Sequence, residues 1–326
     1  MARQAGKLRR TRRAAAPAFD PAVLTQAKRL ARRYPDVIGI DYGYHYKNGA
    51  RTGRIGIRYH VRAKRPLAAL QPERRLPSKI AGVETDVLEA SYQPHAADPF
   101  AVATVLQPGL SVGNVPRTSD GTLGLFVRDR RDGALCLLSN WHVLCGGEQA
   151  QNGDAISQPG PSFSGPNVPR EVAHLRRWID PPRQYDAAIA ATEQGIPIDA
   201  TLLDSTLKSN GIGEPVIGMT AIKAGVSTGV THALVDAING HYQIPYNDFG
   251  GGSFWLQGFC LVPHPDFHDR DVSQPGDSGS VWVDAASGRA IGLHFAGEDD
   301  LGPLKEYALA HALPALFDAL DIAPAI

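Results

Sequence analysis

Between residues 103 and 297 the chain consists of short apolar runs separated by glycine, proline, asparagine and aspartate. Runs such as GALCLLSNWHVL, REVAHLRRWI and SFWLQGFCLV have the length of β-strands, and long helical patterns are few. Many short strands at this spacing are typical of a β-barrel or a β-sandwich. The pattern therefore predicts a mainly β domain, to which we assign residues 96–326.

The region before this domain has a different pattern. Residues 22–34 carry an apolar helical face, and two strand patterns at 37–46 and 54–61 are joined by a Lys-Asn-Gly turn that is typical of a hairpin. A further strand pattern lies at 83–92. These elements predict a small α/β domain over residues 19–95.

The two ends of the chain complete this plan. Residues 1–18 contain six basic residues and no acidic residue, which predicts a solvated, disordered basic tail; contact with phosphates or acidic partners is the alternative. Residues 303–320 have an amphipathic pattern with Leu309, Leu313 and Leu316 among the apolar positions. We expect a C-terminal helix there, kinked or restarted at Pro314.

Charge and cysteine content exclude several classes of function. The 33 basic and 33 acidic residues cancel, so no overall field steers the chain to a membrane, and nucleic-acid binding is not expected. No stretch approaches the roughly 20 apolar residues of a membrane span. The odd number of cysteines and the lack of an apolar secretory signal favour a cytoplasmic protein with buried thiols at Cys136, Cys145 and Cys260.

The stretch SQPGDSGS allows two interpretations: a Gly/Ser turn, or a loop that carries a nucleophilic serine at Ser278. A serine hydroxyl is a weak nucleophile and needs a base and a carboxylate that orients the base. The chain offers His142 in SNWHVL and Asp186 in YDAAIA. Asp180 and Asp199 lack the apolar residues that follow Asp186 and are poorer candidates for the carboxylate.

These three blocks, in the order His, Asp, Ser, resemble the catalytic blocks of the chymotrypsin/trypsin-like serine peptidase family. The segment KAGVSTGVTHALV is similar to the strand that opens the second barrel in bacterial members such as streptogrisins, and RAIGLHFAG resembles the strand after the catalytic serine. The N-terminal unit resembles that of intracellular proteins related to the plant narrow-leaf protease. The resemblance implies a chymotrypsin-like double six-stranded β-barrel with a small N-terminal α/β domain and a C-terminal helix.

The resemblance also implies a role for each residue of the site. Ser278 would attack the scissile carbonyl, His142 would act as base and then acid, and Asp186 would orient the imidazole. The N–H groups of Gly276 and Ser278 would form the oxyanion hole, with Asp277 buried beneath the loop to support it. No Ile-Val-Gly-Gly-like start precedes the first barrel. We therefore expect another internal group, the N-terminal domain or a partner to set this loop.

A substrate pocket is expected at Val272, Ser273, His294, Phe295 and Gly297. Val272 falls where trypsin-like enzymes carry an acid, so this position does not support a preference for arginine or lysine. His294 resembles the pocket histidine of glutamyl endopeptidases. The alternative is that His294 only fills a strand position.

The sequence thus predicts a serine endopeptidase that acts on restricted protein or peptide targets and uses no cofactor. The segment PHPDFHDRD gathers histidines and aspartates without an ordered ligand spacing, so we expect a polar loop there and no metal site. The alternative function is a binding or scaffold protein with negligible turnover. An activating or regulatory protein partner and a homo-oligomer are further expectations, the homo-oligomer by analogy with the plant relatives only.

Overall fold

In the computed structural model, the regular structure consists mainly of β-strands that form two sheets. The structure describes residues 20–47, 49–90, 92, 101–163, 169–246, 251–265, 271–298 and 306–325. The mainly β fold class predicted from the short strand runs is therefore confirmed. None of the helices in these ranges is long and apolar enough to cross a membrane.

The first sheet comprises β5 (Ser111–Asn114), β6 (Ser119–Thr122), β7 (Leu125–Asp129), β8 (Leu135–Ser139), β9 (Ala155–Gln158), β10 (Arg170–Ile179), β11 (Ala187–Thr192) and β18 (Ile322–Pro324). Its order is β18-β7-β8-β11-β10-β9-β5-β6. The chain between β6 and β7 closes it: the Leu123 N–H donates to the Leu110 carbonyl and the Gly124 N–H to the Leu138 carbonyl. With β6 and β7 acting as one bent strand, the described residues form a six-stranded barrel.

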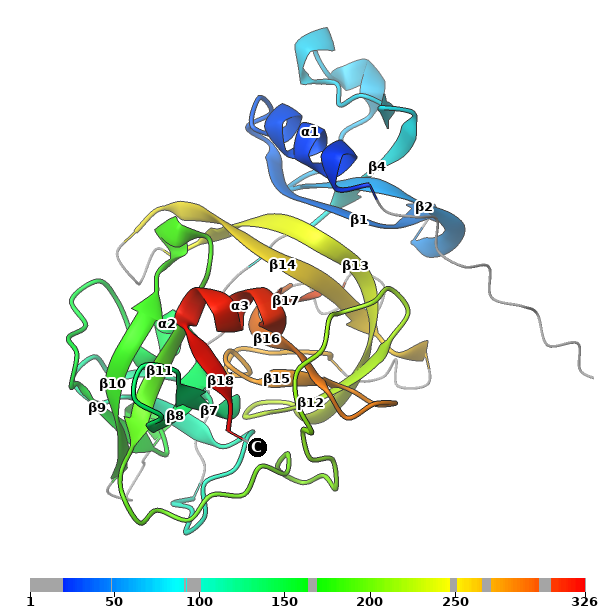
Figure 1. Ribbon diagram of the computed structural model, residues 1–326. Coiled ribbons are helices and arrows are strands. Elements are labelled where there is room, and N and C mark those ends of the chain that lie inside the picture. The colour runs from blue at the N-terminus through cyan, green and yellow to red at the C-terminus, as the bar shows by residue number, and fades with distance from the viewer. Residues whose placement is uncertain are drawn as a thin grey trace, which may run out of the picture.

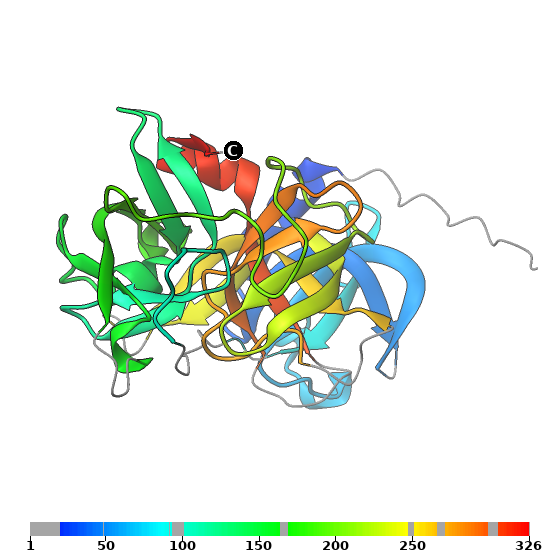
Figure 2. The same ribbon diagram turned by 90° about the horizontal axis from the view of Figure 1, so that it is seen from below.

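The second sheet contains β12 (Thr220–Gly225), β13 (Gly229–Pro245), β14 (Ser253–Pro263), β15 (Val281–Asp284), β16 (Ala290–Gly297) and β17 (Ala308–Ala312). They are ordered β12-β15-β16-β17-β14-β13, and β13 also pairs with β12. That last pairing closes a second barrel of six strands within the described residues. Figures 1 and 2 show the green strands of the first barrel beside the yellow and orange strands of the second. The predicted double barrel is confirmed.

The described residues of the N-terminal unit form one α-helix, α1 (Pro21–Ala31), and four strands: β1 (Val37–Lys47), β2 (Ala50–Val61), β3 (Lys79–Ile80) and β4 (Val83–Glu89). Two 3-10 turns, Leu67–Ala69 and Pro72–Arg74, lie between β2 and β3. The Asp20 carboxylate caps α1 by accepting the Ala22 N–H at 2.8 Å. In the expected hairpin turn, Asn48 lies outside the described residues. The basic tail and the domain boundaries expected at residues 18 and 95 also lie outside them and stay predictions.

Strand β1 pairs with β13, with Ile40 opposite His241, so the N-terminal sheet continues the sheet of the second barrel. Figure 1 shows β1 and β2, in blue, lying along the yellow β13. A buried ion-pair network crosses the seam between β1 and β13. The Arg58 guanidinium donates to both oxygens of Asp41 at 2.6 and 2.7 Å and also to Asp236 on β13. All three side chains are fully buried.

The predicted C-terminal helix over 303–320 is only partly correct. Residues 308–312 form β17, which pairs with β14 and β16, and the helix α3 runs from Leu313 to Leu320. Leu309 is thus a buried strand residue. The segment ALAHA was misread because every residue but the last is buried, so no polar face separates the strand period from the helix period. Pro314 stands in the first turn of α3, where its missing N–H costs nothing.

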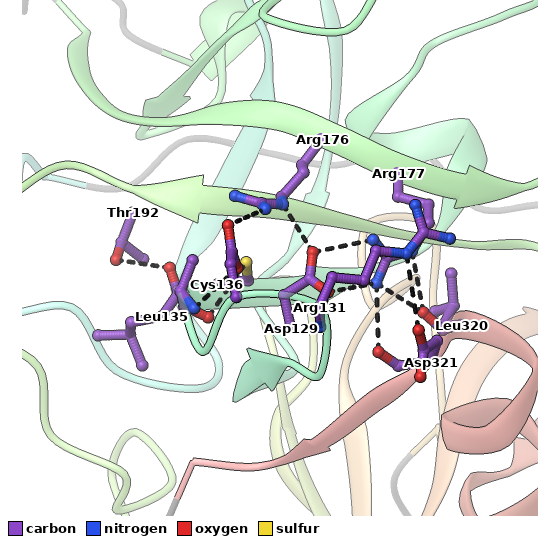
Figure 3. A network of polar contacts seen from close by, with 11 residues as sticks. Asp129, Arg131, Leu135, Cys136, Arg176, Arg177, Thr192, Leu320 and Asp321 are labelled. Carbon is purple, nitrogen blue, oxygen red and sulfur yellow. Dashed lines mark hydrogen bonds and ion pairs between the residues drawn. The ribbon is translucent and has the colours of Figure 1, made fainter.

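The C-terminal segment returns from the second barrel to the first, where β18 pairs with β7. A register shift in β10 between Leu175 and Arg177 lets two consecutive arginines reach the same carboxylate. Arg176 donates to Asp129 at 2.6 Å, and Arg177 donates to it at 2.8 and 2.9 Å and to the Leu320 carbonyl. Figure 3 shows both guanidinium groups converging on Asp129 beside the end of α3.

Candidate active site

His142 lies in α2 (Trp141–Leu144), a single helical turn that directly follows β8. Asp186, just before β11, accepts the His142 backbone N–H at 3.0 Å through one oxygen and the imidazole Nδ1–H at 2.5 Å through the other. The Asn140 side chain also donates to the Asp186 carbonyl at 2.7 Å. Both partners of the His142–Asp186 pair are buried. These bonds fix the imidazole in one orientation and one tautomer.

Two further side chains hold Asp186. The Tyr246 hydroxyl donates to the carboxylate at 2.6 Å, and the Asp186 N–H donates to Nε2 of His311, whose Nδ1–H donates to the Gln257 carbonyl. Burial alone would raise the pKa of Asp186, but the interactions with His142 and Tyr246 hold this pKa below its usual value. Burial lowers the pKa of His311 to about 4, so this ring is neutral at pH 7. Asp186 is therefore ionised and oriented from three sides.

Ser278 lies in the loop between β14 and β15, on the second barrel, and meets the first barrel through β6. Its carbonyl accepts the Thr122 N–H at 2.7 Å. A Cβ built on Gly121 would lie 2.8 Å from the Ser278 carbonyl oxygen and would also clash with Val143, so only glycine fits between them. Because Val143 directly follows His142, the Ser278 loop lies beside the helical turn that carries His142, at the junction of the barrels.

The Ser278 loop has a backbone that requires glycine. Gly276 has a φ of 105°, which residues other than glycine rarely adopt. Its carbonyl accepts the Thr122 hydroxyl at 2.7 Å. The Gly279 N–H donates to the His294 carbonyl at 2.9 Å. Among the described residues, the Gly276 N–H donates no backbone hydrogen bond. The oxyanion-hole role expected for Gly276 and Ser278 stays a prediction.

Asp277 is buried beneath this loop and pairs with Lys223 of β12 at 2.7 Å. The same carboxylate accepts the Thr228 hydroxyl at 2.6 Å and the backbone N–H groups of Ser227 and Gln274 at 2.9 and 3.1 Å. Burial alone would raise the pKa of Asp277, but Lys223 and Thr228 hold this pKa below its usual value. An internal group, Lys223, thus holds the loop through Asp277, as one of the expected alternatives required.

Sequence reasoning missed Lys223, Tyr246 and His311 as parts of this site. Lys223 had one signal: it stands as a lone cation in an apolar strand, and a buried lysine needs a buried acid. Tyr246 follows β13, 60 residues beyond Asp186, and no local pattern links the two. The sequence pattern predicts a helix around His311, so its position beside Asp186 could not be predicted.

The expected pocket residues near Ser278 are buried. The N–H groups of Val272 and Ser273 both donate to the Glu306 carboxylate, the second at 3.3 Å. The Val272 carbonyl accepts the Thr231 hydroxyl at 3.0 Å. The Val272 side chain packs in the core of the second barrel with Trp282. The structure therefore places Glu306 as the anchor of this segment, and the pocket role of Val272 and Ser273 stays a prediction.

His294, Phe295 and Gly297 are all buried residues of β16. Consecutive strand residues point to opposite faces, and the two rings do so here. The His294 ring lies edge-on to Trp282, at 6.4 Å between centroids, whereas the Phe295 ring stacks on His311 at 4.2 Å. Phe295 thus packs against the ring that accepts the Asp186 N–H. The pocket roles of all three residues stay predictions.

The three cysteines are free and buried, as expected from the sequence. Burial raises the pKa of the Cys136 thiol to about 11. Among the described residues no group of three His, Cys, Asp or Glu side chains could hold a metal ion. Residues 266–270 of the PHPDFHDRD segment lie outside the described residues.

No family model matches the sequence, and no curated protein matches it. Among solved structures, the chain is similar to the Nocardiopsis protease NAPase, with 13% identity, a TM-score of 0.48, and coverage of 67% of this chain and 98% of that one. It is similar to Thermobifida fusca protease A, with 14% identity, a TM-score of 0.47, and coverage of 67% and 97%. It is also similar to a glutamic acid specific serine protease that uses a histidine triad in substrate binding, with 19% identity, a TM-score of 0.49, and coverage of 67% and 100%.

Each of these similarities covers about two thirds of this chain. The narrower resemblance to the plant narrow-leaf group stays a prediction.

Proposed function

We propose that the chain is a serine endopeptidase that hydrolyses peptide bonds through an acyl-enzyme on Ser278. The buried bond of 2.5 Å between His142 Nδ1 and Asp186 carries this proposal. An imidazole held through Nδ1 by an ionised carboxylate uses Nε2 as its base. The Ser278 backbone and the residue after His142 both border Gly121, which supports a serine beside that base.

The reaction follows from these positions. Ser278 Oγ attacks the scissile carbonyl while His142 takes the hydroxyl proton, and His142 then gives this proton to the leaving amine. Asp186 stabilises the imidazolium that forms in between, and its own bonds to Tyr246 and the His142 N–H keep it ionised. A water molecule, which gives its proton to His142, then attacks the acyl-enzyme, and the acyl group leaves as Ser278 regains its proton. No cofactor takes part.

The oxyanion loop is set inside the chain by Lys223. In this proposal the ion pair to Asp277 holds Gly276 and Ser278 with their N–H groups toward the developing oxyanion. Because Lys223 belongs to a barrel strand, the pair forms on folding and no cleavage is needed to create it. The full-length protein is therefore active without trimming or an added partner.

Labelling by a fluorophosphonate tests the proposal, because this probe reacts with an activated serine. Wild type is compared with Ser278→Ala and with the matched control Ser287→Ala, a serine exposed on the turn after β15. Wild type and the control should label and hydrolyse casein, and Ser278→Ala should do neither, with equal circular dichroism for all three. Absence of labelling in folded wild type, or equal hydrolysis by Ser278→Ala, would contradict the proposal and favour a scaffold function.

A further inference from the structure

The two barrels are joined at Asp186 as well as at the Ser278 loop. His311 belongs to β17 of the second barrel, and its Nε2 accepts the N–H of Asp186, which precedes β11 of the first barrel, at 3.0 Å. Its Nδ1–H donates at 2.6 Å to the carbonyl of Gln257 on β14, within the second barrel. One side chain thus ties the carboxylate residue of the first barrel to two strands of the second.

The two partners of His311 fix the protonation of its ring. The Asp186 N–H can only donate and the Gln257 carbonyl can only accept, so the imidazole must be neutral with its proton on Nδ1. Burial lowers the pKa of His311 to about 4, against the raising effects of the Asp186 carboxylate and the Gln257 carbonyl. His142 acts in the same direction as burial. The ring therefore keeps this form at neutral pH.

Aromatic neighbours from both barrels hold the His311 ring. Phe295 of β16 stacks on it, at 4.2 Å between centroids and 21° between planes, and the Tyr185 ring of the first barrel lies at 5.3 Å and 56°. Gln257 forms a second link beside it: its N–H donates to the Gln184 carbonyl at 3.0 Å, and its side chain donates to the Gln184 side-chain oxygen at 2.7 Å. The ring therefore has little freedom to move while the barrels keep their positions.

We propose that His311 is a positioning residue: it sets Asp186 relative to Ser278 across the junction of the barrels, and a proton on its Nε2 breaks this link. Ser278 lies on the second barrel, whereas the His142–Asp186 pair lies on the first, so catalysis needs the barrels in one relative position. Protonated Nε2 is a donor that faces the Asp186 N–H, and two donors form no bond. The catalytic effect rests on the proposed function, whereas the effect on the His142–Asp186 bond does not.

Two substitutions of His311 test the positioning role in the full-length protein. His311→Phe keeps an aromatic ring against Phe295 and removes both hydrogen bonds, whereas His311→Gln keeps an oxygen that can accept the Asp186 N–H. The matched control is His174→Gln, a half-exposed histidine of β10 that pairs with Glu193. At neutral pH we expect fluorophosphonate labelling of folded His311→Phe to be about 100-fold slower, with kcat reduced and KM little changed. His311→Gln should show an intermediate loss, and the control none.

Two further measurements distinguish positioning from a general loss of stability. The proton between His142 Nδ1 and Asp186 lies in a bond of 2.5 Å, and a proton in so short a bond gives a low-field signal in proton NMR. This signal should shift in His311→Phe and stay in place in His174→Gln. Below pH 4, while circular dichroism shows folded protein, wild-type labelling should fall with the square of the proton concentration, because His142 and His311 both take up a proton. In His311→Gln it should fall with the first power.

The proposal fails if folded His311→Phe labels at the wild-type rate, or if it labels slowly while the low-field signal stays in place. If His311→Phe does not fold, labelling of His311→Gln at the wild-type rate overturns the positioning role. A fall with the square of the proton concentration in His311→Gln overturns the effect of the proton on Nε2. If wild type does not label at all, the proposed function fails, and the low-field signal of the variants still decides whether His311 positions Asp186.

Discussion

Two fully buried cations stabilise the second barrel in different ways. Arg58 joins Asp41 on β1 to Asp236 on β13, residues that lie far apart in the chain. Lys223 instead meets a single carboxylate, Asp277, whose other bonds come from the turn after β12 and from its own loop. The first pair fixes how two sheet regions join, and the second fixes the shape of one loop. Buried charge thus serves assembly in one place and the candidate chemistry in the other.

The chemistry of the two cations matches these tasks. A guanidinium is a planar fork that can bind one carboxylate through two parallel bonds and still reach a second one, as Arg58 does with Asp41 and Asp236. An ammonium is a compact point charge, and Lys223 donates one hydrogen bond to Asp277 and one to the Thr228 hydroxyl. Exchange of the two cations would therefore not be conservative.

Arg58→Met should have the largest effect on stability. It leaves Asp41 and Asp236 buried without the guanidinium that pairs with both, so we expect a loss of about 3–5 kcal/mol in the free energy of unfolding. Urea denaturation measures this loss. The control Arg54→Met breaks an exposed pair with Glu84 and should cost no more than about 1 kcal/mol. Equal losses for the two variants would show that the seam does not depend on its buried charges.

Lys223→Met should cost less stability, about 3 kcal/mol, because it strands one carboxylate instead of two. It should also slow fluorophosphonate labelling about 100-fold or more, the usual effect of losing an oxyanion-hole donor. The double variant Lys223→Met/Asp277→Leu removes both charges and should regain stability but not labelling. Labelling at the wild-type rate in either variant would show that the active shape of the loop does not depend on the ion pair.

Glu306 extends the comparison to a buried carboxyl group that has no ion pair among the described residues. Burial raises the pKa of Glu306 from 4.5 to about 7, against the opposing effect of the Val272 N–H. Between these pH values the folded chain binds more protons than the unfolded chain, so stability falls as the pH rises, by up to about 3 kcal/mol. Asp277, whose pKa is lowered, has the opposite sign: its contribution is lost as the pH falls below its usual value.

Denaturation of wild type and Glu306→Gln at pH 5 and pH 8 measures this effect. The glutamine keeps the acceptor for the Val272 and Ser273 N–H groups and cannot ionise. We expect the stability of the variant to vary less between the two pH values than that of wild type. The same fall in both proteins would assign the pH dependence to another group.

The sequence was informative wherever the decisive pattern was local. Short strand runs predicted a mainly β domain, and the residues around His142, Asp186 and Ser278 identified three blocks, from whose resemblance to a known family the double barrel was expected. It was not informative for pairings between distant segments. The partner of Lys223 lies 54 residues away, and the pairing of β1 with β13 leaves no trace in the hydrophobic period of either strand. The failure at ALAHA has a different cause, since small buried residues fit a strand and a helix equally well.

The bond between Tyr246 and Asp186 also joins distant segments, and its loss should have the smallest effect of the changes proposed. Tyr246→Phe keeps the ring in the core and removes only the hydroxyl bond to Asp186. Because other donors remain on this carboxylate, we expect a loss of about 1.5 kcal/mol, or about tenfold, in kcat/KM with little change in KM. The loss should fall on the chemical step, because the bond acts on the group that stabilises the imidazolium. A change confined to KM, or a loss as large as that of Lys223→Met, would show that Tyr246 shapes the site in another way.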